Sequence, residues 1–229
     1  MKIAAIVPAA GRGSRINHRL PKQYLPLGGT PIIARTLMAL ESFPAIDEIL
    51  VVVRAEEKEY FHRGIVRKYN LSRVSRIIAG GERRQDSVYN GLESTGEDTA
   101  FVAIHDGVRP FITEDIFMET IAQATLHKAA VVAVPVSDTI KVAKRHGFTG
   151  STLPRDKLWA VQTPQVFERG LILEAHRRAR KENFMGTDDA SLVERMGCPV
   201  KVVEGAPENI KITTPGDLII AEAILGVGK

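Results

Sequence analysis

Near its start the chain reads KIAAIVPAAGRGSR (residues 2–15), an apolar run that passes directly into a loop of small residues. Residues 3–7 predict a buried strand because short apolar side chains fill them without a break. Residues 8–15 place two glycines among alanines and arginines. Successive backbone N–H groups in such a loop form a concavity that accepts an anion, since no Cβ blocks its approach. The sequence therefore predicts a phosphate-binding loop at the carboxyl end of the first strand.

Three kinds of phosphate-binding loop differ in what accompanies the glycines. The P-loop of NTPases needs a Gly-Lys-Ser/Thr ending, which is absent here. The dinucleotide fingerprint needs a small residue where Ile16 stands and an acid where Arg54 stands. With Arg15 and then Pro21-Lys22-Gln23, the loop is similar to the Ala-Ala-Gly-x-Gly-x-Arg loop of sugar nucleotidyltransferases. A plain tight turn would need neither Arg15 nor Lys22, so we interpret the loop as a phosphate site.

Apolar runs alternate with helical segments along the chain, which predicts an α/β fold with a mostly parallel sheet covered on both faces. The predicted strands are residues 3–7, 48–53, 74–79, 100–104, 130–134 and 200–203, and the predicted helices are residues 31–41, 56–69, 83–93, 114–127, 169–182, 188–196 and 215–225. Thr30, Thr113, Thr187 and Thr214 are expected to cap helices. Ligands of such sheets bind at the carboxyl ends of the strands.

Residues 135–165 interrupt this alternation because they contain no clear helix. Residues 138–143, a turn at His146-Gly147 and residues 158–162 predict a hairpin that leaves the main sheet. Its exposed edges need covering, and a second subunit would cover them. We expect one nucleotidyltransferase domain, residues 1–229, with an arm at about residues 136–160.

The charge of the chain is small but unevenly distributed. There are 31 Lys and Arg against 27 Asp and Glu, for a net charge of +4. Residues 1–40 hold six of the cations and no acid, which raises the local concentration of an anionic ligand. With 6% aromatic residues and the excess confined to one segment, nucleic-acid binding is disfavoured.

Other classes of protein are disfavoured by composition. The single cysteine, Cys198, excludes a disulfide framework and a cysteine-built zinc site. No apolar run approaches the length of a membrane span. We therefore expect a soluble cytoplasmic protein.

Three further clusters follow predicted strands. Gly80–Ser87 combines two glycines with a hydroxyl at a helix start, which suits a nucleobase or ribose as well as an ordinary strand–helix turn. In His105–Pro110, Asp106 and Arg109 suit a ligand's hydroxyls or phosphate or a metal, or else form a pair that braces the loop; His105 is expected to be structural. Lys211 has apolar neighbours and either faces water at an edge or points into a site. Arg155 and Thr139, in the arm, have the same two interpretations.

Eight motifs follow one another over nearly the whole chain. They are Pro8-Ala9-Ala10-Gly11-x-Gly13-x-Arg15, Pro21-Lys22-Gln23-Tyr24, Asp86-Ser87-Val88, His105-Asp106-x-x-Arg109-Pro110, Asp138-Thr139, Thr163-Pro164-Gln165, Thr187-Asp188 and Asn209-Ile210-Lys211. The first loop alone would indicate only nucleotidyltransferases in general. Together the motifs resemble the 2-C-methyl-D-erythritol 4-phosphate cytidylyltransferase family. One departure is Gly107-Val108, where the family more usually has small alanines, but the flanking Asp106 and Arg109 are present.

The resemblance implies a three-layer, Rossmann-like nucleotidyltransferase fold with a protruding β-hairpin arm. It also implies that CMP is transferred from CTP to 2-C-methyl-D-erythritol 4-phosphate. The products are 4-diphosphocytidyl-2-C-methyl-D-erythritol and pyrophosphate, in the non-mevalonate isoprenoid pathway, with Mg²⁺ as cofactor. A homodimer whose arms embrace, and which contributes arm residues to the second substrate, is implied as well.

The resemblance also implies roles for individual residues. Arg15 and Lys22 contact the triphosphate and stabilise the transition state. Pro8, Ala9, Ala10, Gly11 and Gly13 form the substrate-binding loop; Gly81, Glu82 and Ser87 match the cytosine and ribose region; Asp106 and Thr163 match the polyol contacts; Thr139, Arg109, Arg155 and Lys211 hold the methylerythritol phosphate; and Thr187 is a further substrate-binding position. Arg15, Lys22, Arg155 and Lys211 are the expected catalytic set.

This chemistry needs positioning and charge rather than a general base, because the attacking phosphate oxygen is already an anion. The obstacle is repulsion between two anions, so cations and alignment supply most of the catalysis. Mg²⁺ prefers oxygens of phosphates and water, so few protein ligands are expected and Asp106 is only a weak candidate.

Two other functions fit parts of the pattern. Ribitol-5-phosphate cytidylyltransferase has a similar loop, and its second substrate is also a polyol phosphate. A non-catalytic nucleotide-binding module is the alternative from another class. The joint presence of Arg15, Lys22, Asp106 and Lys211 speaks against that module.

Overall fold

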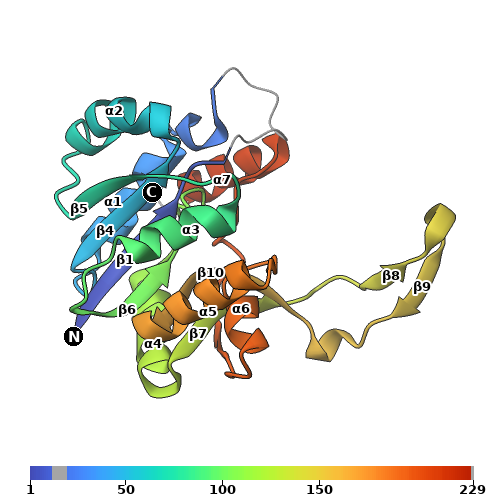
Figure 1. Cartoon of the computed structure of the whole chain (residues 1–229). Helices are drawn as coiled ribbons and strands as arrows, with labels where there is room; N and C mark the ends of the chain where they lie inside the picture. Colours follow the sequence, from blue (N-terminus) through green and yellow to red (C-terminus); the bar gives the residue numbers. More distant parts are fainter. Residues whose placement is uncertain (12–19, 228–229) are drawn as a thin grey trace.

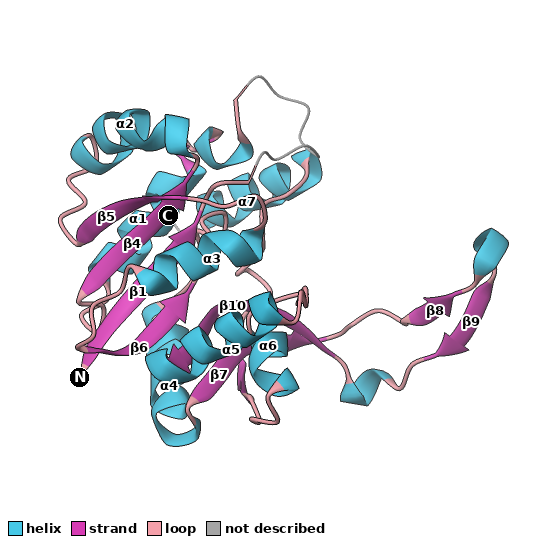
Figure 2. Ribbon diagram, in the orientation of Figure 1, coloured by secondary structure: helices cyan, strands magenta, loops and turns pink. Residues whose placement is uncertain are grey.

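The computed structural model describes residues 1–11 and 20–227, and its centre is a seven-stranded sheet (Figures 1 and 2). The strand order is β11-β7-β10-β6-β1-β4-β5. The strands are β1 (Lys2–Pro8), β4 (Glu48–Val53), β5 (Val74–Ala79), β6 (Thr99–Ile104), β7 (Ala129–Pro135), β10 (Trp159–Glu168) and β11 (Lys201–Glu204). All neighbouring pairs are parallel except those of β10, which runs antiparallel to both β6 and β7. The predicted α/β fold with a mostly parallel sheet is thus confirmed.

Helices cover both faces of this sheet, which is why its strands are apolar on both sides. They are α1 (Ile32–Ser42), α2 (Lys58–Phe61), α3 (Arg84–Glu93), α4 (Glu114–His127), α5 (Arg169–Lys181), α6 (Ala190–Arg195) and α7 (Pro215–Val227). Along β1, residues 3, 5 and 7 belong to a core that includes Leu37 of α1 and Phe117 of α4. Residues 4 and 6 belong to a second core that includes Val88 of α3 and Ile172 of α5.

A third, smaller core lies under α7. It contains Leu27, Val108, Ile212 and Ala221, all buried. Leu27 comes from the short strand β2 (Pro26–Leu27), which pairs with β3 (Thr30–Pro31). No helix within the described residues is both long and apolar enough to cross a bilayer.

The predicted hairpin arm exists, but its second strand was wrongly placed. The arm pairs β8 (Lys141–Ala143) with β9 (Thr149–Thr152) and extends away from the rest of the molecule (Figure 1). Residues 158–162 were assigned to the hairpin from the sequence, but residues 159–162 instead belong to β10 in the main sheet. Within β10, Pro164 has no N–H to donate to a neighbouring strand. The ladder with β7 shifts register between Val161 and Gln165, so the proline falls outside the paired residues.

The helix predictions need smaller corrections. Thr30 does not cap α1, because Thr30–Pro31 pairs as β3 and the helix begins at Ile32. Thr113 occupies the N-cap position of α4 without a side-chain bond, and the cap expected at Thr187 is made by Asp188 Oδ1, which accepts from Ser191 N (3.0 Å). The cap at Thr214 is confirmed, since its hydroxyl accepts from Asp217 N (3.2 Å). The helix predicted over residues 56–69 is divided into the 3-10 turn Ala55–Glu57, α2 and the π-helical turn His62–Arg67.

Gly91 generates a stability prediction because it lets α3 approach β1. A Cβ at this position would lie 2.7 Å from Ile6 Cγ2. We expect Gly91→Ala to lower the free energy of unfolding by about 1–3 kcal/mol through overpacking, although alanine favours helix. Thermal or urea unfolding measures the change.

Gly170 on α5 provides the matched control. A Cβ there has only Glu168 Oε1 within reach, at 3.9 Å. Gly170→Ala should therefore leave stability unchanged or raise it by about 0.4–1 kcal/mol. Equal effects of the two substitutions would contradict the close approach of α3 to β1.

Candidate active site

A pocket lies at the carboxyl ends of β1, β5 and β6, where the predicted loops come together. Its lining includes ten of the residues predicted from the sequence: Pro8, Ala9, Ala10, Gly11, Lys22, Gly81, Glu82, Ser87, Asp106 and Lys211. Gln23, Arg83, Arg84 and Val108 complete it. Segments separated by up to two hundred residues thus meet at one edge of the sheet, as expected for a parallel α/β fold.

A second pocket adjoins the first and shares its wall. Arg84, Asp106 and Lys211 line both pockets. The second pocket also contains three further predicted residues, Arg109, Thr163 and Thr187, together with Val161, Gln162, Gln165 and Asp188. Two ligands bound side by side would therefore meet at Asp106 and its neighbouring cations.

Two predicted residues within the described part of the chain line neither of these pockets. Thr139 and Arg155 are exposed on the arm and line neither pocket. Arg155 Nη1 donates to the carbonyl of Ser137 (2.7 Å), within the arm itself. Gly13 and Arg15 lie outside the described residues.

The two small-residue loops of the first pocket are fixed by backbone bonds. Ala9 N donates to Val52 O (2.7 Å), and Gly80 N donates to Val53 O (2.7 Å), so both loops continue along the end of β4. A Cβ on Gly80 would lie 2.6 Å from the Cβ of Ala10, so glycine is required for this approach. Ser87 Oγ accepts from Gly81 N (3.1 Å) and holds the second loop closed. The strand–helix turn expected for Gly80–Ser87 is present, and its role as a ligand loop stays a prediction.

Lys22 reaches the first pocket from a short 3-10 turn, Lys22–Tyr24, whose other residues are anchored. Gln23 Nε2 donates to Ala9 O (2.9 Å), tying the turn to the glycine loop. The Tyr24 hydroxyl donates to Glu57 Oε2 (2.9 Å), and burial together with Glu57 raises the pKa of Tyr24. The turn is thereby held at both the loop and the core, which fixes where the Lys22 side chain begins.

Asp106 is the most heavily paired carboxylate of the site. Its Oδ1 accepts from Arg84 Nε (3.2 Å), and its Oδ2 lies 2.8 Å from Lys211 Nζ and 3.5 Å from Arg109 Nε. Burial alone would raise the pKa of Asp106, but Arg84, Lys211 and Arg109 hold that pKa well below its usual range. The Asp106–Arg109 pair considered from the sequence is present, and it is part of a cluster of one acid and three cations.

The loop of Asp106 is held from below by a buried histidine. His105 Nε2 donates to Arg109 O (2.9 Å), and its Nδ1 accepts from the Thr163 hydroxyl (3.1 Å). The Thr163 oxygen in turn accepts from Asp106 N (3.0 Å). Complete burial lowers the pKa of His105 to about 4, so the ring is neutral at physiological pH. These contacts agree with the structural role expected for His105.

Comparison with known proteins places the whole chain in one family. Residues 3–227 match the family model described as 2-C-methyl-D-erythritol 4-phosphate cytidylyltransferase. The chain belongs to this family. Curated relatives with the same name include those of Caldanaerobacter subterraneus subsp. tengcongensis, 50% identical (98% of this chain and 99% of the relative), and Pelotomaculum thermopropionicum, 48% identical (98% and 94%).

Solved structures agree with that membership of the cytidylyltransferase family. The 4-diphosphocytidyl-2C-methyl-D-erythritol synthase of Anaerococcus prevotii aligns with a TM-score of 0.87 at 34% identity, covering 98% of this chain and 96% of its own. The 2-C-methyl-D-erythritol 4-phosphate cytidylyltransferase of Thermus thermophilus aligns with a TM-score of 0.81 at 34% identity, covering 99% and 100%. The chain is thus a nucleotidyltransferase, and its fold is the one seen in cytidylyltransferases of this family.

Sequence reasoning missed several residues of this cytidylyltransferase site. Arg84 lies inside the quoted Gly80–Ser87 motif, yet nothing in the motif shows that its guanidinium bridges Asp106 and Asp189 (2.7 Å to Asp189 Oδ2). Asn209 is fully buried, and its Nδ2 donates to Thr163 O (2.9 Å). Both contacts join segments that are distant in sequence, so only the fold reveals them.

The buried His105 generates a pH prediction. The unfolded chain binds a proton on this residue below pH 6.5, whereas the folded chain does so only below about pH 4. Because the unfolded state then binds more protons, stability falls as the pH is lowered from 6.5 toward 4. We expect His105→Gln to reduce this loss in unfolding curves measured across that range.

His127, exposed on α4, provides the control substitution. His105→Gln also alters the hydrogen bonds of residue 105, which changes stability at every pH. The comparison therefore uses only the slope of the free energy of unfolding against pH. Identical slopes for wild type, His105→Gln and His127→Gln would show that the ring is not held neutral.

Proposed function

We propose that the two adjoining pockets are where this chain carries out the reaction of its family, the transfer of CMP from CTP to 2-C-methyl-D-erythritol 4-phosphate. The observation that carries the proposal is the shared wall, where Asp106 holds Arg84 and Lys211 between the pockets. Two anionic reactants brought to that wall meet fixed positive charge. The ribitol 5-phosphate alternative is not favoured, since the curated relatives are named for the methylerythritol substrate.

CTP is assigned to the first pocket. The backbone N–H groups of Ala10 and Gly11 and the Lys22 ammonium suit its phosphates, and Arg15 is proposed to join them. Gly81, Glu82 and Ser87 line the same pocket on the side of α3, where the cytosine and ribose are proposed to bind. The base preference follows from the family and not from any side chain in the pocket.

The methylerythritol phosphate is assigned to the second pocket. Asp106 and Thr163 offer oxygens to polyol hydroxyls, while Arg109 and Lys211 offer cations to the phosphate. Thr187, exposed at the pocket rim, is proposed to contact the same ligand.

The step itself joins two anions. A phosphate oxygen of methylerythritol phosphate attacks the α-phosphorus of CTP, the bond from that phosphorus to the bridging oxygen of the β-phosphate breaks, and pyrophosphate leaves. No proton has to be removed from the nucleophile. A cation about 4 Å from a phosphate charge contributes on the order of 4 kcal/mol at an effective dielectric near 20. The electrostatic stabilisation from Lys22 and from the cations beside Asp106 is therefore large enough to govern the rate, together with alignment of the reactants.

Mg²⁺ is proposed to arrive with CTP. Within residues 1–11 and 20–227, no three His, Cys, Asp or Glu side chains gather as a metal site. Both oxygens of Asp106, the weak candidate ligand, already face cations. The described residues therefore do not fit a resident metal, and phosphate oxygens and water suit Mg²⁺ instead.

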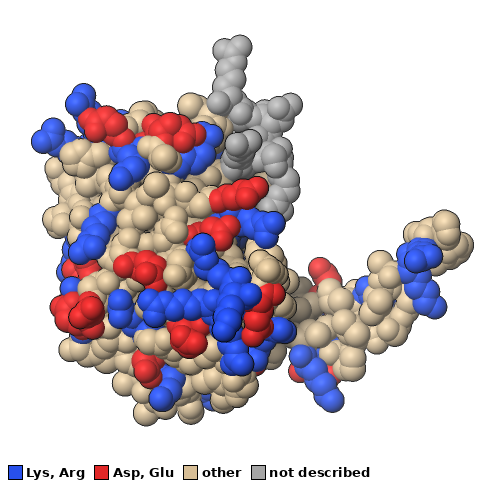
Figure 3. All heavy atoms as spheres, viewed as in Figure 1, with Lys and Arg blue, Asp and Glu red and all other residues tan. Residues whose placement is uncertain are grey.

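The arm is proposed to complete the second pocket of a partner subunit in a homodimer. Ile140, Val142, Phe148 and Trp159 are exposed apolar residues that a partner would cover. Lys and Arg side chains are visible along the arm in Figure 3, which suits contact with a phosphate. This proposal accounts for Arg155 and Thr139, which line neither of the two pockets of their own chain. A single domain with this arm, in the cytoplasm, stays our prediction for the chain.

The basic test of the proposed function is a pyrophosphate-release assay with four nucleoside triphosphates and with methylerythritol and ribitol phosphates. Release is expected only when CTP and methylerythritol phosphate are combined. Preference for ribitol phosphate, or absence of release, would contradict the assignment.

Lys22→Ala tests the charge in the first pocket. We expect turnover to fall at least about a hundredfold, comparable to the loss of one oxyanion donor, while folding survives. Single-turnover kinetics and circular dichroism measure the two quantities. Turnover close to that of the wild type would refute the role of Lys22.

Arg155→Ala tests the arm, and we expect it to weaken methylerythritol phosphate far more than CTP. Co-expressing it with Lys22→Ala tests whether the arm acts across the dimer. If the arm reaches the partner, each mixed dimer has one site in which both Lys22 and Arg155 are intact. Random pairing makes about half of the dimers mixed, so about one site in four is active. Absence of regained activity, or equal weakening of both substrates, would contradict the proposal.

A further inference from the structure

Asp189 is a buried carboxylate that lines neither pocket, yet it is connected to their shared wall. It is 1% exposed and stands at the N-cap position of α6 without making a side-chain cap bond. Its Oδ2 instead accepts from Arg84 Nη1 (2.7 Å), and its Oδ1 accepts from His176 Nε2 (3.2 Å). A carboxylate at this depth requires such partners, because an unpaired buried charge is strongly destabilising.

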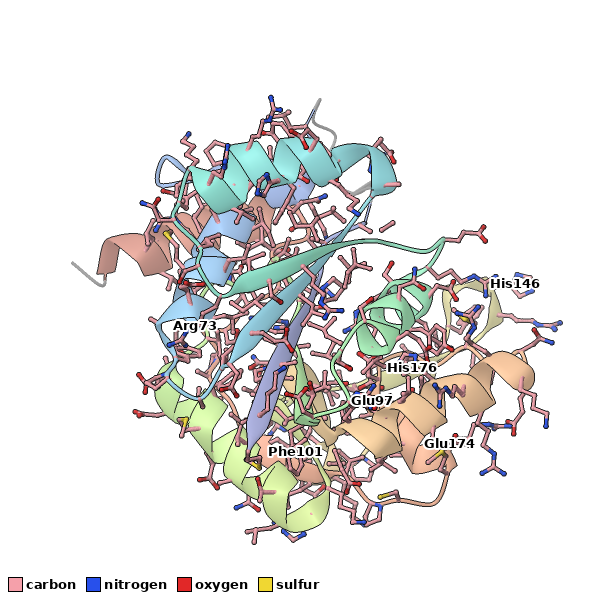
Figure 4. All side chains as sticks on the ribbon, turned by 60° about the vertical axis from the view of Figure 1, so that its left-hand side comes forward. Arg73, Glu97, Phe101, His146, Glu174 and His176 are labelled. Carbon is pink, nitrogen blue, oxygen red and sulfur yellow. The ribbon has the colours of Figure 1, made fainter. Side chains whose placement is uncertain are left out.

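His176 fixes the position of Asp189 from the other side. It is fully buried on α5, and its ring stacks on Tyr89 of α3 with centroids 6.3 Å apart. Figure 4 shows His176 between these two helices. Burial alone would raise the pKa of Asp189, but Arg84 and His176 lower it. Asp189 is therefore a fixed negative charge between α3, α5 and α6.

Arg84 connects Asp189 to the site. One end of its guanidinium contacts Asp189, and its Nε donates to Asp106 Oδ1 (3.2 Å). Asp106 Oδ2 is then left for Lys211 (2.8 Å). The order His176, Asp189, Arg84, Asp106, Lys211 is a continuous row of charged and hydrogen-bonded groups that ends between the two pockets.

We infer that Asp189 is a positioning residue for the reaction: it holds Arg84 so that Asp106 and Lys211 keep their places at the shared wall. This inference rests on the proposed function and extends it to a residue behind the pockets. Without the Asp189 charge, Arg84 would be free to turn toward a phosphate of either reactant. Asp106 would lose its Oδ1 partner, and the cation facing the second substrate would lose its fixed place.

The Asp189→Asn variant keeps the shape of the side chain and removes its charge. We expect the KM for methylerythritol phosphate to rise at least about tenfold, the scale of one lost charged hydrogen bond, with CTP affinity by calorimetry changed much less. Gln85→Met is the matched control. Gln85 also joins α3 to the segment before α6, through Phe184 O and Gly186 N, and neither of these hydrogen bonds involves Asp106. It should lower stability without moving this KM.

A double-mutant cycle separates positioning from a general loss of structure. In the Arg84→Met background, Asp189 has no Arg84 left to position. Adding Asp189→Asn there should change the KM for methylerythritol phosphate less than about twofold, since coupled residues do not act additively. Equal losses in both backgrounds, or an Asp189→Asn variant that behaves like Gln85→Met, would overturn the inference. An inactive wild type would instead contradict the proposed function itself.

Discussion

The site depends on one interaction, the pairing of a buried carboxylate with the cations around it. Asp106 follows β6 at the carboxyl edge of the sheet, where it is only 6% exposed and solvent stabilises its charge little. Three cations stabilise that charge instead: Arg84 of α3, Arg109 of the same loop, and Lys211 of the segment after β11. Removing a partner from such a group costs far more than removing an exposed ion pair, because the remaining charge stays buried. The same interaction that allows Asp106 to be buried therefore also determines where the cations of the site stand.

The fold supplies the arrangement that this interaction requires. Parallel strands end at one edge, so the loops after β1, β5 and β6 are neighbours without any long connection between them. The antiparallel strand β10 brings Thr163 under the Asp106 loop, and His105 closes the space between them. The small core beneath α7 supports Val108 and Ile212, which stand beside Arg109 and Lys211 in the chain. Apolar packing thus fixes the backbone, and the charged groups are held at its edge.

Much of the sheet and of the first pocket could be predicted because the signals are local. An apolar run followed by glycines identifies both a strand and the loop at its end, as for residues 3–11. β10 was missed because Pro164 is a local signal against a strand, and only the register of both neighbouring strands shows how the sheet accommodates it. Arg84 and Asp189 are 105 residues apart, and neither has a local feature that indicates the other. Arg155 and Thr139 were left with two interpretations by the sequence, and in one chain they line neither of the two pockets.

The most direct test of the central claim is the protonation state of Asp106 itself. Its carboxyl carbon can be followed by NMR as the pH is lowered through 3.8, the ordinary pKa of an aspartic acid, while the amide signals report a folded chain. If three cations hold the group ionised, its chemical shift stays at the carboxylate value through that point. A carboxyl that titrates at 3.8 or above in the folded protein would contradict the account.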